Sequence, residues 1–241
     1  MLEIKKLSYK HSNGKKAKDV FVFDDFDLRI KENQFVTVFG PSGCGKSTLI
    51  NLVAGYIPTQ KGKIIIKGKV TAAPGVNRIV INQQDDLFYW LTVEQNMKLV
   101  TTDNQMIDKY LKLLNLDSCT SLYPRELSGG MKKRLSLARA LVADGDFILM
   151  DEPFSALDLS LKEKIHIELL KLKQETNKTF LMVTHDVEEA IFLSDRIIIL
   201  SNEVPSKIVK DLSISFDTKR DLSIKKKQKF FNLKNDLLRF V

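Results

Sequence analysis

Residues 40–48 have the residue types and spacing of a loop that binds phosphate groups. They read Gly40-Pro41-Ser42-Gly43-Cys44-Gly45-Lys46-Ser47-Thr48 and fit the pattern G-x-x-x-x-G-K-[ST]. The glycines allow successive backbone N–H groups to surround phosphate oxygens, and the N-terminus of a following helix adds positive potential there. We expect Lys46 to reach the β- and γ-phosphates of a nucleotide and the Ser47 hydroxyl to bind Mg²⁺.

A second motif, further along the chain, places two carboxylates after an apolar segment. Phe147–Met150 are all apolar and are followed by Asp151 and Glu152. Such a run is typical of a strand buried on both faces, and open α/β sheets bind ligands at the carboxyl ends of their strands. We expect Asp151 to hold Mg²⁺ and Glu152 to act as the general base that polarises an attacking water. The pair of motifs disfavours the alternative that residues 40–48 are a chance glycine-rich turn.

A third motif, Ser128-Gly129-Gly130, stands where a helix is predicted to begin. A hydroxyl, bare backbone amides and the positive end of a helix make a second anion-binding site. Taken alone, the same residues would be read as a simple helix N-cap. Their occurrence together with a phosphate loop in one chain distinguishes this chain from small-molecule kinases, GTPases and helicases.

The predicted elements that position these motifs alternate between strand and helix. Strands are expected at residues 2–8, 20–30, 34–39, 63–67, 78–82, 147–150, 180–183 and 197–200, with helices between many of them. A polar hairpin loop is expected from His11 to Lys18. This alternation predicts an α/β fold with a mostly parallel core sheet and right-handed crossovers.

The three motifs together resemble those of the ABC transporter ATPase family, whose signature is Leu-Ser-Gly-Gly followed by Gln or Met. Leu127-Ser128-Gly129-Gly130-Met131 matches it, and the likeness extends from about Leu2 to about Asp211. The resemblance implies a P-loop NTPase fold with an N-terminal antiparallel β subdomain. It also implies a helical signature subdomain, expected at about 84–145, within a single domain spanning residues 1–241. Residues 201–241 are expected to form a short basic tail, helical or extended, that packs on the core.

The resemblance also implies roles for further residues. Thr184-His185-Asp186 is similar to the family's switch-histidine region, in which His185 would bond the γ-phosphate and fix the attacking water. Gln83 takes the Q-loop position and would ligate Mg²⁺, with Gln84 as a one-residue alternative. Ala156-Leu157-Asp158 is similar to the D-loop. ATP and Mg²⁺ are the cofactors implied.

The family stacks an aromatic ring on adenine, and the nearest position here is His11, with Tyr9 as the alternative. The implied nucleotide-binding set is His11, residues 40–48, Ser128, Gly129 and Gly130. In this family the signature of one protomer closes over the phosphate loop of another. The implied partners are therefore a second copy of the chain, integral membrane permease subunits and, indirectly, a solute-binding protein.

The distribution of charge and of apolar residues restricts the partners and the location that the chain could have. The 241 residues carry a formal charge of +8, and residues 201–241 hold ten Lys/Arg against five Asp/Glu, which is five of the eight excess charges. The run around Lys225–Lys229 is therefore read as a solvated terminal face, with lipid headgroup contact as a weaker option and no nucleic acid partner expected. No apolar run reaches the ~18–20 residues of a membrane span and no signal core is apparent, so a peripheral location on the cytoplasmic face of the cell membrane is expected.

Flanking segments narrow the resemblance within the family. Residues 74–80, 87–93 and 188–196 look like importer ATPases for nitrate, sulfonate, taurine and thiamine-precursor uptake. Two departures are Tyr89, where proline is usual, and Ser206, where glycine commonly follows the proline. Trp90 is read with equal weight as core packing or as part of a groove that receives a permease helix.

The chain is therefore expected to power uptake of a small solute, anionic or a thiamine precursor. An exporter or lipoprotein-release ATPase is the alternative within the family. A non-transport ABC ATPase for DNA repair or translation is disfavoured, because no coiled-coil insertion or second cassette is present. A pseudo-ATPase is disfavoured by intact Lys46, Glu152 and His185.

Overall fold

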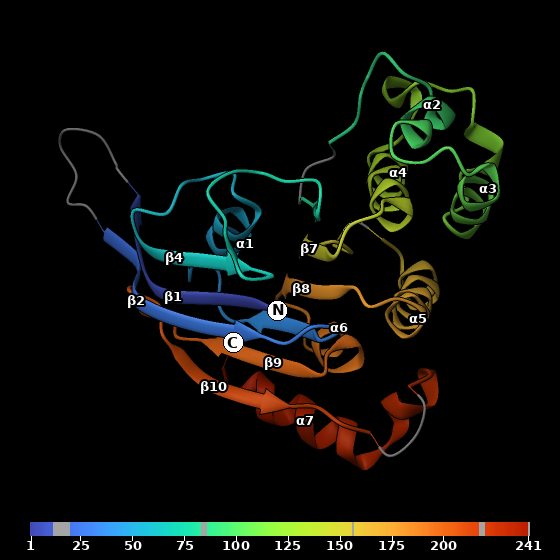
Figure 1. The fold of residues 1–241 in the computed structure, drawn as a ribbon. Coiled ribbons are helices and arrows are strands. Elements are labelled where there is room, and N and C mark those ends of the chain that lie inside the picture. The colour runs from blue at the N-terminus through green and yellow to red at the C-terminus, as the bar shows by residue number, and fades with distance from the viewer. Residues whose placement is uncertain (12–19, 83–85, 156, 217–219, 241) are drawn as a thin grey trace.

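The computed structural model describes residues 1–11, 20–82, 86–155, 157–216 and 220–240. Its described strands form two sheets, and helices are distributed around them (Figure 1). Among the described helices, none combines the length and the apolar character that a membrane span requires.

The larger sheet positions most of the predicted site. Its order is β10(Ile208–Ser213), β9(Arg196–Leu200), β3(Phe35–Phe39), β8(Thr179–Thr184), β7(Phe147–Asp151) and β6(Arg78–Ile81). All neighbours are parallel except β10, which pairs antiparallel with β9. The expected mostly parallel core sheet is confirmed.

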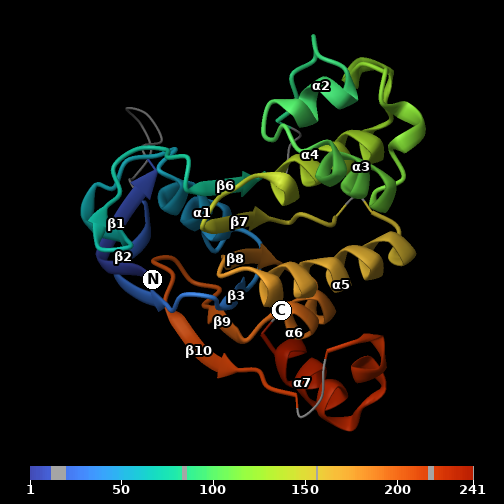
Figure 2. The same cartoon turned by 45° about the vertical axis from the view of Figure 1, so that its right-hand side comes forward.

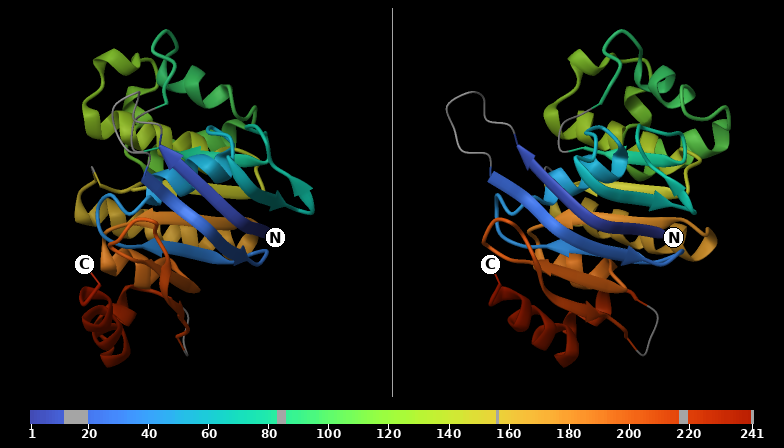
Figure 3. Two further views of the ribbon diagram at one scale, coloured as in Figure 1. Left: turned by 90° about the vertical axis from the view of Figure 1, so that its left-hand side faces the viewer. Right: turned by 60° about the vertical axis from the view of Figure 1, so that its left-hand side comes forward.

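The smaller sheet is antiparallel, as predicted for the N-terminal part of the chain. Its order is β2(Val20–Ile30), β1(Leu2–His11), β4(Lys61–Ile66) and β5(Lys69–Val70). Strand β1 is longer than expected and ends at His11, which pairs with Val20. The expectation of a loop beginning at His11 is therefore wrong, because the strand pairing continues through that residue. Figure 3 shows β1 and β2 crossing the molecule beside the central strands.

Both faces of the central sheet are buried. Val36 and Val38 of β3 face helix α1(Lys46–Ala54) and the smaller sheet in one apolar cluster. Phe35 and Phe39 face the opposite cluster. That cluster includes helices α5(Leu159–Glu175) and α6(Val187–Leu193), which lie together on their side of the strands in Figure 2. Because side chains alternate along a strand, one short apolar segment supplies both cores.

A helical group follows β6 in the chain. It contains α2(Val93–Lys98), α3(Asn104–Leu113), the 3-10 turns η1(Asp117–Cys119) and η2(Pro124–Glu126), and α4(Gly129–Val142). Thr92 begins α2 with a capping box to Gln95, and the Asp103 carboxylate accepts from two backbone amides of α3. These caps satisfy N–H groups that the first helical turn leaves without partners.

The C-terminal segment packs on the core, as expected, through β10, η3(Leu222–Lys226) and α7(Gln228–Leu238). Ile224, Phe230 and Leu237 are buried in the cluster that contains α6. The reading of the basic run as a solvated face is wrong for Lys225. Its ammonium lies 2.9 Å from Glu163 and 3.9 Å from Glu188, because η3 folds back onto α5 and α6. Helix α7 lies at the opposite end of the molecule from α2 and α3 (Figure 1, Figure 3).

Candidate nucleotide site

The predicted phosphate loop connects β3 to α1, as the motif requires. Gly43 and Gly45 have φ angles of +82° and +93°, in the left-handed region that favours glycine. A Cβ on Gly45 would lie 2.5 Å from Cγ1 of Val22, so a side chain is excluded there by contact as well as by conformation. Gly55, also left-handed, ends α1 where the sequence predicted.

Lys46 is folded back onto the loop. Its Nζ donates to the carbonyl oxygens of Gly40 and Pro41, each at 2.7 Å, and the residue is 8% exposed. The ammonium is thus held by backbone oxygens at the start of the loop that it is predicted to serve. A buried cation next to a loop of N–H donors concentrates positive potential at one place.

Asp151 ends strand β7, and its carboxyl lies near enough to the Ser47 hydroxyl for this group to affect its pKa. Burial raises the pKa of the Asp151 carboxyl, and the nearby Glu152 raises it further, against the lowering effect of the Ser47 hydroxyl and of Lys46 and Lys133. Two hard oxygen groups, a hydroxyl and a carboxylate, therefore meet at the edge of the loop. This donor set suits Mg²⁺.

Glu152 and His185 lie against each other. Nδ1 of His185 is 2.9 Å from Oε1 of Glu152, and the two side chains are 64% and 20% exposed. Glu152 has a φ of +47°, unusual for a residue with a side chain. Its N–H donates to the Val183 carbonyl, and its own carbonyl accepts from Ser155, which hold this conformation. Strain of this kind is often found at functional positions.

A buried carboxylate stabilises the backbone segment that carries His185. Glu189, 5% exposed at its side chain, accepts from the Thr184 hydroxyl and from Lys162 of α5, both at 2.9 Å. Burial raises the pKa of Glu189. Thr184 Oγ1 in turn accepts from the Asp186 N–H, and Asp186 caps α6. The predicted switch segment is therefore fixed on both sides of His185.

A cleft of about 420 Å³ lies over the loop. It is lined by His11, Val22, Ser42, Gly43, Gly45, Lys46, Ser47, Thr48 and Glu152. His11 reaches it from the end of β1, with Nε2 3.3 Å from Oγ1 of Thr48 and its ring edge-on to Tyr9. Of the two candidates for adenine stacking, His11 lines the cleft and Tyr9 does not.

The predicted signature residues are not among those that line this cleft. Ser128 is the N-cap of α4, and its Oγ accepts from the Met131 N–H at 3.3 Å. Ser128 and Gly129 are exposed and Gly130 is half-buried. Gln83, its alternative Gln84 and Ala156 lie outside the described residues.

Comparison with known proteins agrees with this geometry. Residues 23–155, more than half of the chain, match the model of the ABC transporter family. The chain belongs to the ABC transporter family. It is 40% identical to an aliphatic sulfonates import ATP-binding protein of Bacillus cereus, covering 82% of this chain and 80% of that one. A nitrate import ATP-binding protein of Synechococcus elongatus is 37% identical, with 82% and 76% covered.

A solved structure of another ATP-binding cassette has the same fold as this chain. The dimeric, post-hydrolysis state of an ATP-binding cassette bound to ADP and Pi matches with a TM-score of 0.79 and 28% identity. The match covers 90% of this chain and all of that one. The α/β P-loop fold of the ABC ATPase type is therefore confirmed.

In this ABC cassette, two contacts at the loop have no signal in the motifs. Val22 lies against Gly45 from strand β2, and Ser206 reaches the loop from the turn after β9. Both come from segments outside the motif, brought there by tertiary packing. The sequence carries one hint of the second contact, since Ser206 stands where the resemblance implies glycine.

Proposed function

We propose that this chain is the ATP-hydrolysing subunit of an ABC importer. The observation that carries the proposal is the Glu152–His185 pair, in which Glu152 lines the cleft formed by the phosphate loop and His185 contacts Glu152. A carboxylate and an imidazole in hydrogen-bond contact beside a phosphate cradle suit activation of a water for attack on a phosphoryl group.

Binding of ATP uses the loop and Lys46. The N–H groups of the loop donate to oxygens of the β- and γ-phosphates, whose negative charge the helix dipole of α1 also stabilises. Lys46 exchanges the Gly40 and Pro41 carbonyls for phosphate oxygens. His11 provides a ring at the cleft edge for adenine. Ser47 and Asp151, with Gln83, would hold Mg²⁺, which neutralises charge on the phosphates when bound.

Hydrolysis uses Glu152 and His185. Glu152 accepts a proton from water while the water oxygen bonds to the γ-phosphorus and the bond to the bridging oxygen breaks. This leaves ADP and inorganic phosphate. His185, exposed and in contact with Glu152, orients the water and donates to the γ-phosphate. The brace through Glu189 limits movement of this segment.

The active unit is a pair of chains. Ser128, Gly129 and Gly130 are outside the cleft of their own chain, and they open helix α4 with backbone N–H groups directed away from the helix. This placement supports their action on ATP bound by a second copy. The dimeric form of the related ATP-binding cassette is consistent with this assembly.

The transport partner is a separate membrane permease, with the chain bound peripherally at the cytoplasmic face. Trp90 is 72% exposed and Tyr89 is 43% exposed, next to Phe88, whose ring lies 5.4 Å from that of Trp90. An exposed aromatic group a few positions after Gln83 in the sequence supports the interpretation of Trp90 as part of a permease-binding groove. The names of the relatives support import of a small anion such as a sulfonate or nitrate.

The test is phosphate release by the purified chain, alone and with its permease in proteoliposomes. Hydrolysis should require ATP and Mg²⁺ and stop with a chelator. Trp90→Ala should leave hydrolysis by the isolated chain unchanged and weaken permease binding, while Val76→Ala, at an even more exposed apolar site (93%), serves as control. Absence of hydrolysis in both preparations would refute the proposal. Uptake of sulfonate or nitrate into the vesicles identifies the cargo.

A further inference from the structure

Ser206 joins the turn between β9 and β10 to the phosphate loop. The residue is 1% exposed, and its Oγ donates to the carbonyl oxygen of Cys44 at 2.6 Å, across 162 positions of sequence. Its N–H donates to the Val22 carbonyl at 2.8 Å. Ser206 therefore connects the loop to strand β2, whose Val22 side chain packs against Gly45.

The hydrogen bond from Ser206 sets the orientation of the peptide between Cys44 and Gly45. The Cys44 carbonyl and the Gly45 N–H belong to one planar trans peptide, so they point in opposite directions. Since the carbonyl is held toward buried Ser206, the N–H is directed to the other side of the loop. Gly45 lines the cleft and has a φ of +93°, a conformation that glycine adopts without strain.

We propose that Ser206 is a positioning residue for nucleotide binding. Its hydroxyl fixes the Cys44–Gly45 peptide with the N–H presented to the phosphates before ATP arrives, which lowers the ordering cost of binding. The backbone bond from Ser206 to Val22 does not need the side chain, so the bond from the hydroxyl to Cys44 is the part of the contact that a substitution removes. This inference rests on the proposed binding of ATP at the loop.

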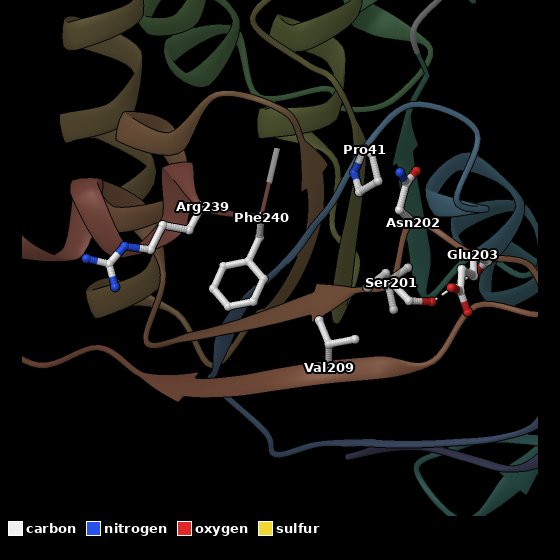
Figure 4. A pocket seen from close by; sticks show the side chains of 8 residues that line it. Pro41, Ser201, Asn202, Glu203, Val209, Arg239 and Phe240 are labelled. Carbon is white, nitrogen blue, oxygen red and sulfur yellow. Dashed lines mark hydrogen bonds between the residues drawn. The ribbon is translucent and has the colours of Figure 1, made fainter.

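Other residues of the same turn lie near the phosphate loop. Pro41 and the turn residues Ser201, Asn202 and Glu203 line one cavity of about 470 Å³ (Figure 4). Ser201 bonds within the turn, donating to the Glu203 carbonyl at 3.0 Å and accepting from the Lys207 N–H. Ser201 is thus a matched control: a hydroxyl of the same turn that stabilises the turn alone.

The experiment compares Ser206→Ala and Ser206→Gly with Ser201→Ala. ATP and ADP affinities are measured by titration calorimetry, KM and kcat by phosphate release, and hydrogen–deuterium exchange on the loop peptide without nucleotide. Loss of one buried hydrogen bond should weaken nucleotide binding about three- to ten-fold in both Ser206 variants. KM should rise in parallel with little change in kcat, and the loop amides should exchange faster. Ser201→Ala should match the native chain in affinity.

Several results would overturn the inference. One is native affinity and native loop exchange in both Ser206 variants, and another is an equal loss in Ser201→Ala, which would assign the effect to the turn. A lowered melting temperature with unchanged affinity would also count against it, because it indicates a structural role only. If the native chain itself bound no ATP, the proposed function would fail, an outcome that the native titration alone reveals.

Discussion

Nδ1 of His185 lies 2.9 Å from Oε1 of Glu152, although the residues are 33 positions apart. The contact follows from the sheet, because β7 and β8 are parallel neighbours in which Asp151 pairs with Val183. Each side chain stands just beyond the carboxyl end of its strand. The proposed base and its partner are thus brought together by strand register rather than by local sequence.

Glu152→Gln should abolish turnover and retain ATP. The amide keeps the shape of the side chain but cannot accept the proton, so hydrolysis should fall by about 10²–10⁴-fold. ATP-dependent dimers should accumulate, measured by light scattering after gel filtration. Glu94→Gln, on the exposed face of α2, should behave as the native chain. A Glu152→Gln protein that hydrolysed ATP normally, or failed to dimerise with it, would contradict the base assignment.

Lys46→Ala and Asp151→Asn should separate the phosphate site from the metal site. Removing the Lys46 ammonium deletes charged bonds to phosphate, so ATP affinity should fall by about 10- to 100-fold with or without Mg²⁺. Asp151→Asn should weaken binding only when Mg²⁺ is present. Calorimetry in chelator and in excess Mg²⁺ measures both. Equal losses by Asp151→Asn in the two conditions would remove Asp151 from the metal site.

His166 should make the fold sensitive to acid. It is 3% exposed, both ring nitrogens lack partners among the described residues, and its ring packs against Phe154 at 4.7 Å. Burial, with Lys225 and Lys162 nearby, lowers its pKa to about 3 from 6.5, with an opposing effect from Asp186. The unfolded chain therefore binds the proton more readily, and stability is lost as pH falls from 6.5 toward 3.

His166→Leu tests this directly. Between pH 7 and pH 5 the native chain should lose about 2 kcal/mol of unfolding free energy through this residue, and the variant should not. At neutral pH the variant should be as stable as the native chain or more so, because an unpaired buried polar group is removed. Urea unfolding at the two pH values measures the difference. Identical pH dependence in both proteins would show that His166 does not titrate on unfolding.

Phe230→Ala and Phe231→Ala compare neighbours on α7. Phe230 is 2% exposed and packs into the larger core, while Phe231 is 56% exposed. The first change should cost about 3–5 kcal/mol of stability through lost burial and a cavity, and the second less than about 0.5 kcal/mol. Thermal or urea unfolding checks both. Equal small effects would mean that the C-terminal segment is not part of the core.

Much of the site could be predicted because its motifs are local. A loop of nine consecutive residues, a carboxylate pair after a buried strand and a capped helix start each carry their chemistry in adjacent positions. The strands before and after them follow from apolar runs, as β3 and β7 show. The helix predicted to start near Ser128 starts at Gly129 for the same reason, since its cap is encoded beside it.

Other features depended on contacts between distant segments. Strand β1 continues to His11 because β2 pairs with it, and Lys225 is partly buried because η3 returns to α5 and α6. Neither fact is visible in the residues themselves, which are polar or charged. The Thr184–Glu189–Lys162 brace likewise requires two helices to meet.

The sequence by itself determined the phosphate loop, the carboxylates Asp151 and Glu152 and the α/β alternation, because each depends on neighbouring residues and a backbone period. Only the tertiary structure decided that His185 meets Glu152, that His11 reaches the cleft and that Ser206 bonds the loop at Cys44. These contacts arise from the order and register of strands. Strand order depends on the free energy of packing the whole chain, which no local pattern contains.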